Sequence, residues 1–176
     1  MMTMPITLQT TRDDHLIAWL AALAITIHIA EGILPSPLPG IKPGLANVIT
    51  IAVLLRYGWR MALWVSLLRV LAGSLLLGTF LSPAFILSLS GALCSIAIIG
   101  AAYSLRRWLP GRGLGPLGYS VLAAMAHMAG QFWIAYTLFI PHPGLLHLLP
   151  VLMTAAVIFG IVSGIIANAM LTKIPA

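Results

Sequence analysis

Long apolar runs separated by short polar connections follow one another along the chain. A hydrocarbon core about 30 Å thick needs roughly 20 residues of helix to cross it. Measured against that length, the pattern predicts six spans: Leu16–Leu34, Leu45–Arg56, Trp59–Phe80, Pro83–Leu105, Pro116–Ile140 and Leu145–Leu171. The second is too short to cross upright, and its border with the third, within RYGWR at 56–60, is open to a shift of several residues. We therefore expect an all-α, polytopic six-helix bundle.

Composition supports a membrane protein. The 176 residues are 61% hydrophobic and only 7% charged, and the mean hydropathy is +1.08, whereas soluble domains carry about 25% charged residues. We expect one transmembrane domain over residues 16–171, a cytoplasmic N-terminal segment over 1–15 and a short tail over 172–176. The N-terminal sequence lacks the features of a cleaved signal peptide, so we expect the first helix to remain in the mature protein.

The basic residues predict the orientation. Six spans place both termini on one side, and seven basic residues fall on that side: Arg12, Arg56, Arg60, Arg106, Arg107, Arg112 and Lys173. Only Lys42 falls on the opposite side. The positive-inside bias therefore predicts cytoplasmic termini. Because these residues are scattered over span ends and do not line one face, we expect no nucleic-acid partner.

A loop rich in proline and glycine follows the first span, in the stretch EGILPSPLPGIKPGLANVIT. The orientation makes residues 35–44 extracytoplasmic, and their composition restricts the conformations of the loop. We expect this loop to act as a lid, with Glu31 and Asn47 at its two ends and Lys42 adding a positive charge.

Arg69 lies near the middle of the third span, where a charge is expensive and should face the bundle interior with a partner. Glu31, on the first span, is the acidic residue nearest to that depth. The pair is interpreted either as a salt bridge that joins two helices or as part of a ligand site. With Lys42 above the same region, the surplus positive charge favours an anionic or strongly polar ligand.

His127 and Gln131 are one helical turn apart on the fifth span, at a depth similar to that of Arg69. They either form hydrogen bonds between helices or contact a ligand. Asn47 opens the second span and either caps that helix or points into the same cavity. We expect no metal site, because His142 and His147 at an outer turn have few further ligands nearby, and the single Cys94 excludes a disulfide framework.

Small residues recur at four-residue spacing on the first and last spans. Ala18 and Ala22 form one such pair, and Gly160 and Gly164 form the other. This spacing lets helix backbones approach closely, either within the bundle or against another subunit.

Three stretches carry a family resemblance: KPGLANVIT, SLLRVLAGSLLLGTFLSPAFILSLSGALCS and AHMAGQFWIA. Through them the chain resembles the bacterial Gx transporter family, often labelled heptaprenyl diphosphate synthase component I and grouped with the S components of energy-coupling factor transporters. The resemblance covers about Ile25 to Leu171 and implies a multi-pass protein of the bacterial inner membrane. It also implies six helices, an outward-facing ligand site, a covering first loop, and partner ATPases with a transmembrane coupling subunit.

Two details of the resemblance bear on partners and metals. Ala18 and Ala22 match the small residues with which S components commonly meet the coupling subunit. Nickel and cobalt S components use a histidine near the N-terminus, whereas this chain begins MMTMPITLQ, which argues against those metals.

The synthase label conflicts with the chemistry of the chain. A synthase of that kind holds magnesium on a substrate diphosphate with several carboxylates, and this chain has three acidic residues in total. We therefore expect no enzyme activity and no cofactor. The leading prediction is an S-component-type protein that captures a small polar or anionic vitamin-like ligand through Glu31, Lys42, Asn47, Arg69, His127 and Gln131.

Two alternatives stay open. One is a membrane subunit of a quinone- or flavin-linked electron-transfer system with a flavin-linked redox partner. The other is a non-transporting scaffold, in which the buried polar groups only set helix packing.

Overall fold

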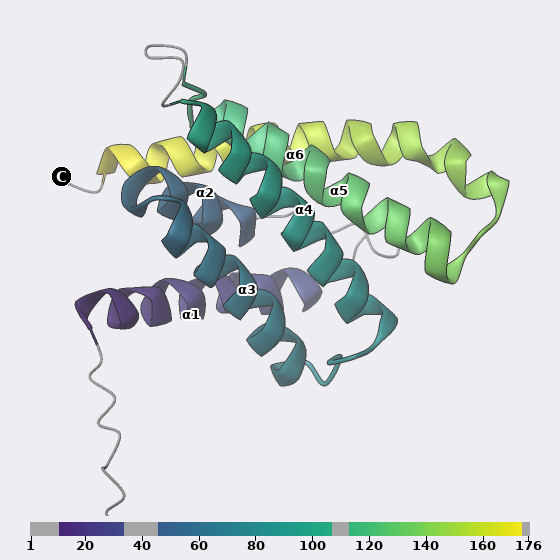
Figure 1. Ribbon diagram of the computed structural model, residues 1–176, viewed down its shortest axis with the longest axis horizontal. Coiled ribbons are helices and arrows are strands. Elements are labelled where there is room, and N and C mark those ends of the chain that lie inside the picture. The colour runs from purple at the N-terminus through teal and green to yellow at the C-terminus, as the bar shows by residue number, and fades with distance from the viewer. Residues whose placement is uncertain (1–10, 34–45, 107–112, 174–176) are drawn as a thin grey trace, which may run out of the picture.

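The protein is an all-α bundle, and the computed structural model describes residues 11–33, 46–106 and 113–173 (Figure 1). Within these ranges no strand occurs. The α-helices are α1 (Arg12–Ile33), α2 (Ala46–Tyr57), α3 (Trp59–Leu76), α4 (Pro83–Leu105), α5 (Pro116–Ile134) and α6 (Leu149–Lys173). A π-helix, η1 (Ala135–Phe139), continues α5, and a 3₁₀-helix, η2 (Pro143–Leu148), precedes α6. The predicted all-α, six-helix fold is confirmed.

Some helices begin or end at other residues than predicted. Their ends are set by polar caps and turns, which the pattern of apolar residues does not reveal. Helix α1 begins at Arg12, before the predicted start at Leu16, because Thr11 and Asp14 cap each other. The Asp14 carboxylate accepts from the Thr11 N–H and Oγ1–H at 2.8 Å each, and the Asp14 N–H donates to Thr11 Oγ1 at 3.3 Å. Helix α3 stops at Leu76, short of the predicted Phe80, and a turn with positive φ at Gly78 and Leu81 follows.

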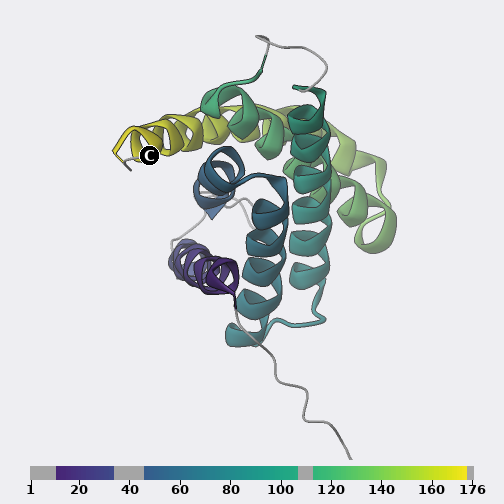
Figure 2. The ribbon, with the colours of Figure 1, turned by 60° about the vertical axis from the view of Figure 1, so that its left-hand side comes forward.

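Helix α2 is short and lies in the centre of the bundle. It has 12 residues. Five other described helices are long and apolar enough to cross a membrane, whereas α2 is too short, as its predicted length indicated. Residues 47–54 are all buried, and α2 contacts α1, α3, α5 and α6. Figure 2 shows it enclosed between α1, α3 and α6.

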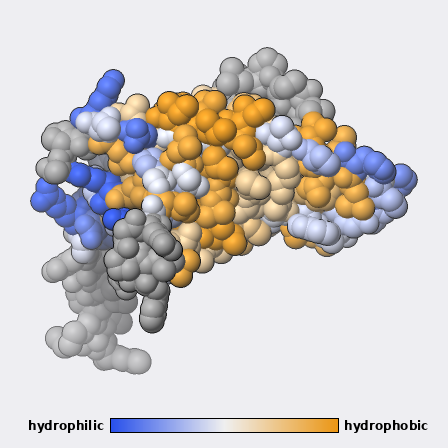
Figure 3. Space-filling model, turned by 90° about the horizontal axis from the view of Figure 1, so that it is seen from above, coloured by the Kyte–Doolittle hydropathy of each residue, from blue (hydrophilic) through white to orange (hydrophobic). Residues whose placement is uncertain are grey.

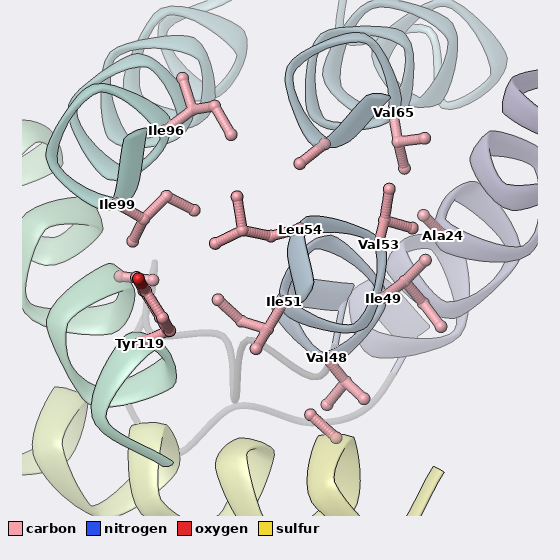
Figure 4. Close-up of a cluster of buried hydrophobic side chains, with 13 residues drawn as sticks. Ala24, Val48, Ile49, Ile51, Val53, Leu54, Val65, Ile96, Ile99 and Tyr119 are labelled. Carbon is pink, nitrogen blue, oxygen red and sulfur yellow. The ribbon is translucent and has the colours of Figure 1, made fainter. Parts of the chain in front are cut away.

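The side chains of α2 form the centre of the main apolar core. In Figure 4, Val53 is directed toward Val65 of α3, and Leu54 toward Ile96 of α4. Ala24 of α1 and Tyr119 of α5 complete the ring around the helix. A helix that is apolar on every face is typical of a buried core element. Helix α2 is therefore the central helix against which the longer helices pack.

The surface is that of a membrane protein. Figure 3 shows an apolar band across the middle of the face in view, with hydrophilic residues toward both ends. Large apolar side chains are exposed on the described helices, for example Trp19 at 77% and Ile165 at 57%. The end at which α1 begins and α6 ends carries exposed Arg12, Arg60 and Lys173. The chain is therefore a multi-pass membrane protein.

Glycines on α6 allow close packing against α5. A Cβ at Gly160 would lie 2.9 Å from Val121 Cα, and one at Gly164 would lie 2.7 Å from Leu117 Cα. Because both new contacts would be with backbone atoms, neither position tolerates a side chain without separation of the helices. These two glycines pack inside the bundle, one of the two interpretations that the sequence left open.

Candidate functional site

A cavity between the helices is lined by residues from all six of them. One representative from each helix, in chain order, is His28, Asn47, Arg69, Ser88, Gln131 and Phe159. Helix α5 contributes most, since His127 and Met128 also line the cavity. Because α2 and α3 contribute Asn47 and Arg69, the cavity lies where the α1–α3 half of the chain meets the α4–α6 half.

Arg69 and Asn47 form the charged part of the lining. Both are buried, with 4% of Arg69 and 7% of Asn47 exposed. One N–H of the Arg69 guanidinium donates to Asn47 Oδ1 at 3.3 Å. Asn47 lies in the first turn of α2 and Arg69 on α3. Their hydrogen bond therefore joins the two helices at the cavity. Asn47 lines the cavity, as one of its two predicted interpretations has it.

His127 and Gln131 lie on one face of α5 against a glycine of α4. A Cβ at Gly91 would lie 2.8 Å from His127 Nε2 and 2.8 Å from Gln131 Cγ. The missing side chain at Gly91 is therefore what lets these two polar groups approach α4 at the cavity. The sequence placed His127 and Gln131 on the same face, and the structure brings them to the same cavity as Arg69.

Buried hydroxyls extend the polar lining on α5 and α6. Ser120 is 1% exposed and Ser163 is 2% exposed, and both line the cavity. Ser120 Oγ and His127 Nδ1 are buried without a hydrogen-bond partner among the described residues. Buried polar atoms without partners are rare in native proteins and indicate water or ligand.

Sequence reasoning missed His28, Ser120 and Ser163. His28 carried a usable signal, because a histidine inside a span belongs among the intramembrane polar residues that mark sites. The serines carried none, since serine is common at close helix contacts in membranes. Only the packing of α5 against α6 places their hydroxyls at the cavity.

The cavity is small, and its described lining carries one permanent charge. Its volume is about 60 Å³, and one water takes about 10–15 Å³ on that scale. Among the described lining residues, Arg69 alone is permanently charged. Apolar side chains from Val70, Met128 and Phe159 share the lining. The described cavity therefore suits a compact group that combines polar acceptors with a little apolar surface.

Several predicted residues lie elsewhere. Lys42 and the loop over 35–44 fall outside the described residues, as does the side chain of Glu31, so the predicted lid and the Glu31–Arg69 pair stay predictions. Ala18 and Ala22 are exposed on α1, away from the cavity.

Metal ligands do not gather in the described part of the chain, where no group of three His, Cys, Asp or Glu residues is close enough to hold an ion. His142 instead caps η2, because its Nδ1 accepts from the Gly144 N–H at 3.0 Å.

Comparison with known proteins identifies one family. The model of the family described as heptaprenyl diphosphate synthase component I matches residues 20–170. No curated protein matches the chain, and no solved structure does.

Proposed function

We propose that this chain, which belongs to the heptaprenyl diphosphate synthase component I family, is a membrane-embedded substrate-binding protein of the S-component type. It takes up a small polar or anionic ligand from the extracytoplasmic side of the bacterial inner membrane. The observation that carries the proposal is the cavity, to which all six helices contribute and which holds Arg69, Asn47, His127 and Gln131. Polar and charged side chains inside a membrane bundle mark ligand pathways more often than they serve packing alone.

The size of the cavity limits the size of the ligand. Pockets for drug-sized molecules measure about 300–1,000 Å³, several times the volume of about 60 Å³ described between these helices. A compact ligand fits the helices as they stand. A vitamin-sized ligand exceeds the volume of the cavity as described.

The proposal assigns binding and not prenyl diphosphate synthesis. That chemistry requires several carboxylates to hold magnesium on a diphosphate, and the chain has three acidic residues in total. Two of them, Asp13 and Asp14, lie in the first turn of α1 and do not line the cavity. Purified protein is expected to yield no product from prenyl diphosphate substrates.

Helix α1 offers the surface for a coupling partner. Ala18, Ala22 and Leu23 lie on one exposed face together with Trp19. Small residues at four-residue spacing allow a second helix to approach closely. We propose that a transmembrane coupling subunit with ATPases docks on this face. Ala18→Leu with Ala22→Leu is then expected to abolish uptake and leave ligand binding intact.

Native mass spectrometry of protein gently extracted from its own membrane tests the ligand-binding proposal. Wild-type protein is expected to carry an added small polar or anionic molecule. Gln131→Leu is expected to lose that mass, because it removes a polar group from the cavity. Ser95→Ala is the matched control, since Ser95 is a buried hydroxyl of α4 outside the lining, and it should retain the ligand.

Other results contradict the proposal. A quinone or flavin as the added mass would favour the electron-transfer alternative. An absence of any added mass, together with normal uptake of all tested nutrients in a deletion strain, would leave the scaffold alternative.

A further inference from the structure

A second cavity lies where the chain turns from α2 into α3, beside the last turn of α4. We call it the corner groove, and its volume is about 380 Å³. Its described lining consists of six residues: Tyr57, Gly58, Trp59, Arg60, Tyr103 and Ser104. None of them lines the central cavity between the six helices, so the corner groove is a separate site.

Packing of the corner against α4 gives the groove its shape. The Trp59 Nε1–H donates to the carbonyl of Ile96 at 3.2 Å. The missing side chain at Gly100 makes room for the indole, because a Cβ there would lie 2.6 Å from Trp59 Cδ1. A Cβ at Gly58 would lie 3.8 Å from the hydroxyl oxygen of Tyr103. These contacts join the start of α3 to α4, so the groove is formed before any ligand binds.

The residues of the groove are those of a membrane–water interface. Tyr57 is 42% exposed and Trp59 is 36% exposed, and tyrosine and tryptophan gather at the level of the lipid headgroups. Arg60 and Ser104 beside them are also exposed. Figure 1 shows the end of α2, the start of α3 and the end of α4 on one side of the molecule. The positive-inside bias predicts that this side faces the cytoplasm.

The charge of the groove is positive. Arg60 lines it and makes no ion pair with another described residue. Arg106 follows two residues after Ser104 and is exposed. All three acidic residues of the chain belong to α1, and none is in the described lining of the groove. A partner of the groove is therefore expected to be an anion.

The volume and the hydroxyl groups indicate what kind of anion fits. Ligand sites commonly measure about 300–1,000 Å³, so about 380 Å³ accommodates a small organic anion and is too large for a single inorganic ion. Tyr57, Tyr103 and Ser104 supply hydroxyl groups that are able to donate to phosphate oxygens. The ring of Trp59 supplies an apolar surface beside them. A phosphate that carries a glycerol-sized organic part uses both kinds of lining.

We propose that the corner groove binds the headgroup of an anionic phospholipid from the adjacent leaflet. The Arg60 guanidinium binds the phosphate, since its planar fork of N–H donors matches two phosphate oxygens. The acyl chains lie along exposed apolar side chains such as Leu105, which is 54% exposed. The cytoplasmic leaflet is rich in anionic lipids that basic residues near the membrane attract. This inference is independent of the ligand of the central cavity.

Native mass spectrometry of the full-length, delipidated protein tests the lipid site. Phosphatidylglycerol, phosphatidylcholine with the same acyl chains, and soluble glycerol 3-phosphate are titrated at equal concentrations. Phosphatidylglycerol is expected to be retained about fivefold more than phosphatidylcholine, since one basic residue near a membrane surface contributes about that factor. Glycerol 3-phosphate is expected to be retained less than either lipid, because it has no acyl chains.

Variants locate the bound lipid. Arg60→Gln is expected to remove the preference for phosphatidylglycerol, and Arg60→Lys is expected to restore part of it, because the charge returns without the fork. Since Arg60 is exposed, the unfolding temperature without lipid should stay unchanged. Tyr103→Phe is a second variant, expected to weaken phosphatidylglycerol binding by loss of one hydroxyl group. Arg12→Gln is the matched control, because Arg12 is an exposed basic residue outside the described lining, and it should bind as the wild type does.

Each of the other outcomes overturns the proposal. Equal retention of the two lipids would mean that the groove does not recognise the headgroup charge. Retention of glycerol 3-phosphate equal to that of phosphatidylglycerol would mean a site for a soluble phosphate compound. An unchanged preference in Arg60→Gln, or an equal loss in Arg12→Gln, would place the lipid outside the groove.

Discussion

At the scale of single residues, the site depends on a few side chains that hold one another in place. Asn47 accepts from Arg69 at 3.3 Å, and Gly91 leaves the space into which His127 and Gln131 fit. These contacts join residues that are between 22 and 40 positions apart in sequence. A substitution at a supporting residue should therefore change the site although it touches no ligand.

Replacement of Asn47 by leucine should destabilise the protein. The change removes the Oδ1 acceptor from a buried guanidinium, and loss of a buried hydrogen-bond partner costs about 1–3 kcal/mol. Thermal unfolding in detergent measures the effect. Thr50→Val is the matched control one turn along α2, because the buried Thr50 Oγ1 has no hydrogen-bond partner in the described residues, and it should be close to neutral. Equal effects of the two variants would show that Asn47 does not support Arg69.

Gly91→Ala should impair ligand retention more than stability. The added Cβ would lie 2.8 Å from both His127 Nε2 and Gln131 Cγ, so these side chains must turn toward the cavity and occupy part of it. Retention by native mass spectrometry should fall several-fold. Gly115→Ala is the control, since a Cβ there meets nothing within 4 Å. Unchanged retention in Gly91→Ala would separate His127 and Gln131 from ligand binding.

At the scale of elements, the bundle consists of one short central helix, α2, and the longer helices that surround it. Helix α2 is buried over 47–54 and is followed at once by Gly58, whose φ of +91° suits glycine and disfavours other residues. The sharp corner turns the chain from α2 into α3. Helices α5 and α6 are held together differently, through glycines that bring their backbones into contact.

Gly164→Leu should separate α5 from α6 and lower the yield of folded protein. A Cβ at Gly164 would lie 2.7 Å from Leu117 Cα, and a backbone atom yields only if the helices move apart. We expect destabilisation of about 2 kcal/mol or more, in the range of overpacked cores. Ile165→Leu, at a neighbouring position that is 57% exposed, should fold normally. Normal folding of Gly164→Leu would mean that α5 and α6 are able to separate without loss of the fold.

At the scale of the whole molecule, the polar ends and the apolar band define how the protein sits in a bilayer. Exposed basic residues lie where α1 begins, where α2 ends and α3 begins, and where α6 ends: Arg12, Arg56, Arg60 and Lys173. Figure 1 shows these helix ends on one side of the molecule. The connection through η1 and η2 lies at the other end (Figure 1). The positive-inside bias then predicts that the basic end is cytoplasmic.

Cysteine labelling in whole cells tests this orientation. In a Cys94→Ala background, His147→Cys should react with a membrane-impermeant thiol reagent, because His147 lies exposed in η2 at the outer end. Leu114→Cys, exposed just before α5, should react only after permeabilisation. The reverse pattern would invert the topology, and equal reaction would contradict a single orientation.

The sequence by itself determined the class of the protein and the number of helices. Apolar run length is a local property, so five long helices and one short one follow from counting residues against the bilayer. The same-face relation of His127 and Gln131 is also local, because it depends only on the helical repeat.

Only the tertiary structure decided which residues meet. That α2 lies at the centre, that His28 and Ser120 line the cavity, and that Gly160 and Gly164 face α5 all depend on helix packing. Contacts between positions far apart in the chain leave no periodic trace in one sequence, since each helix is almost uniformly apolar and nearly any face is able to turn inward. The cavity and the contact of buried Arg69 with Asn47 therefore become visible only when the six helices are assembled.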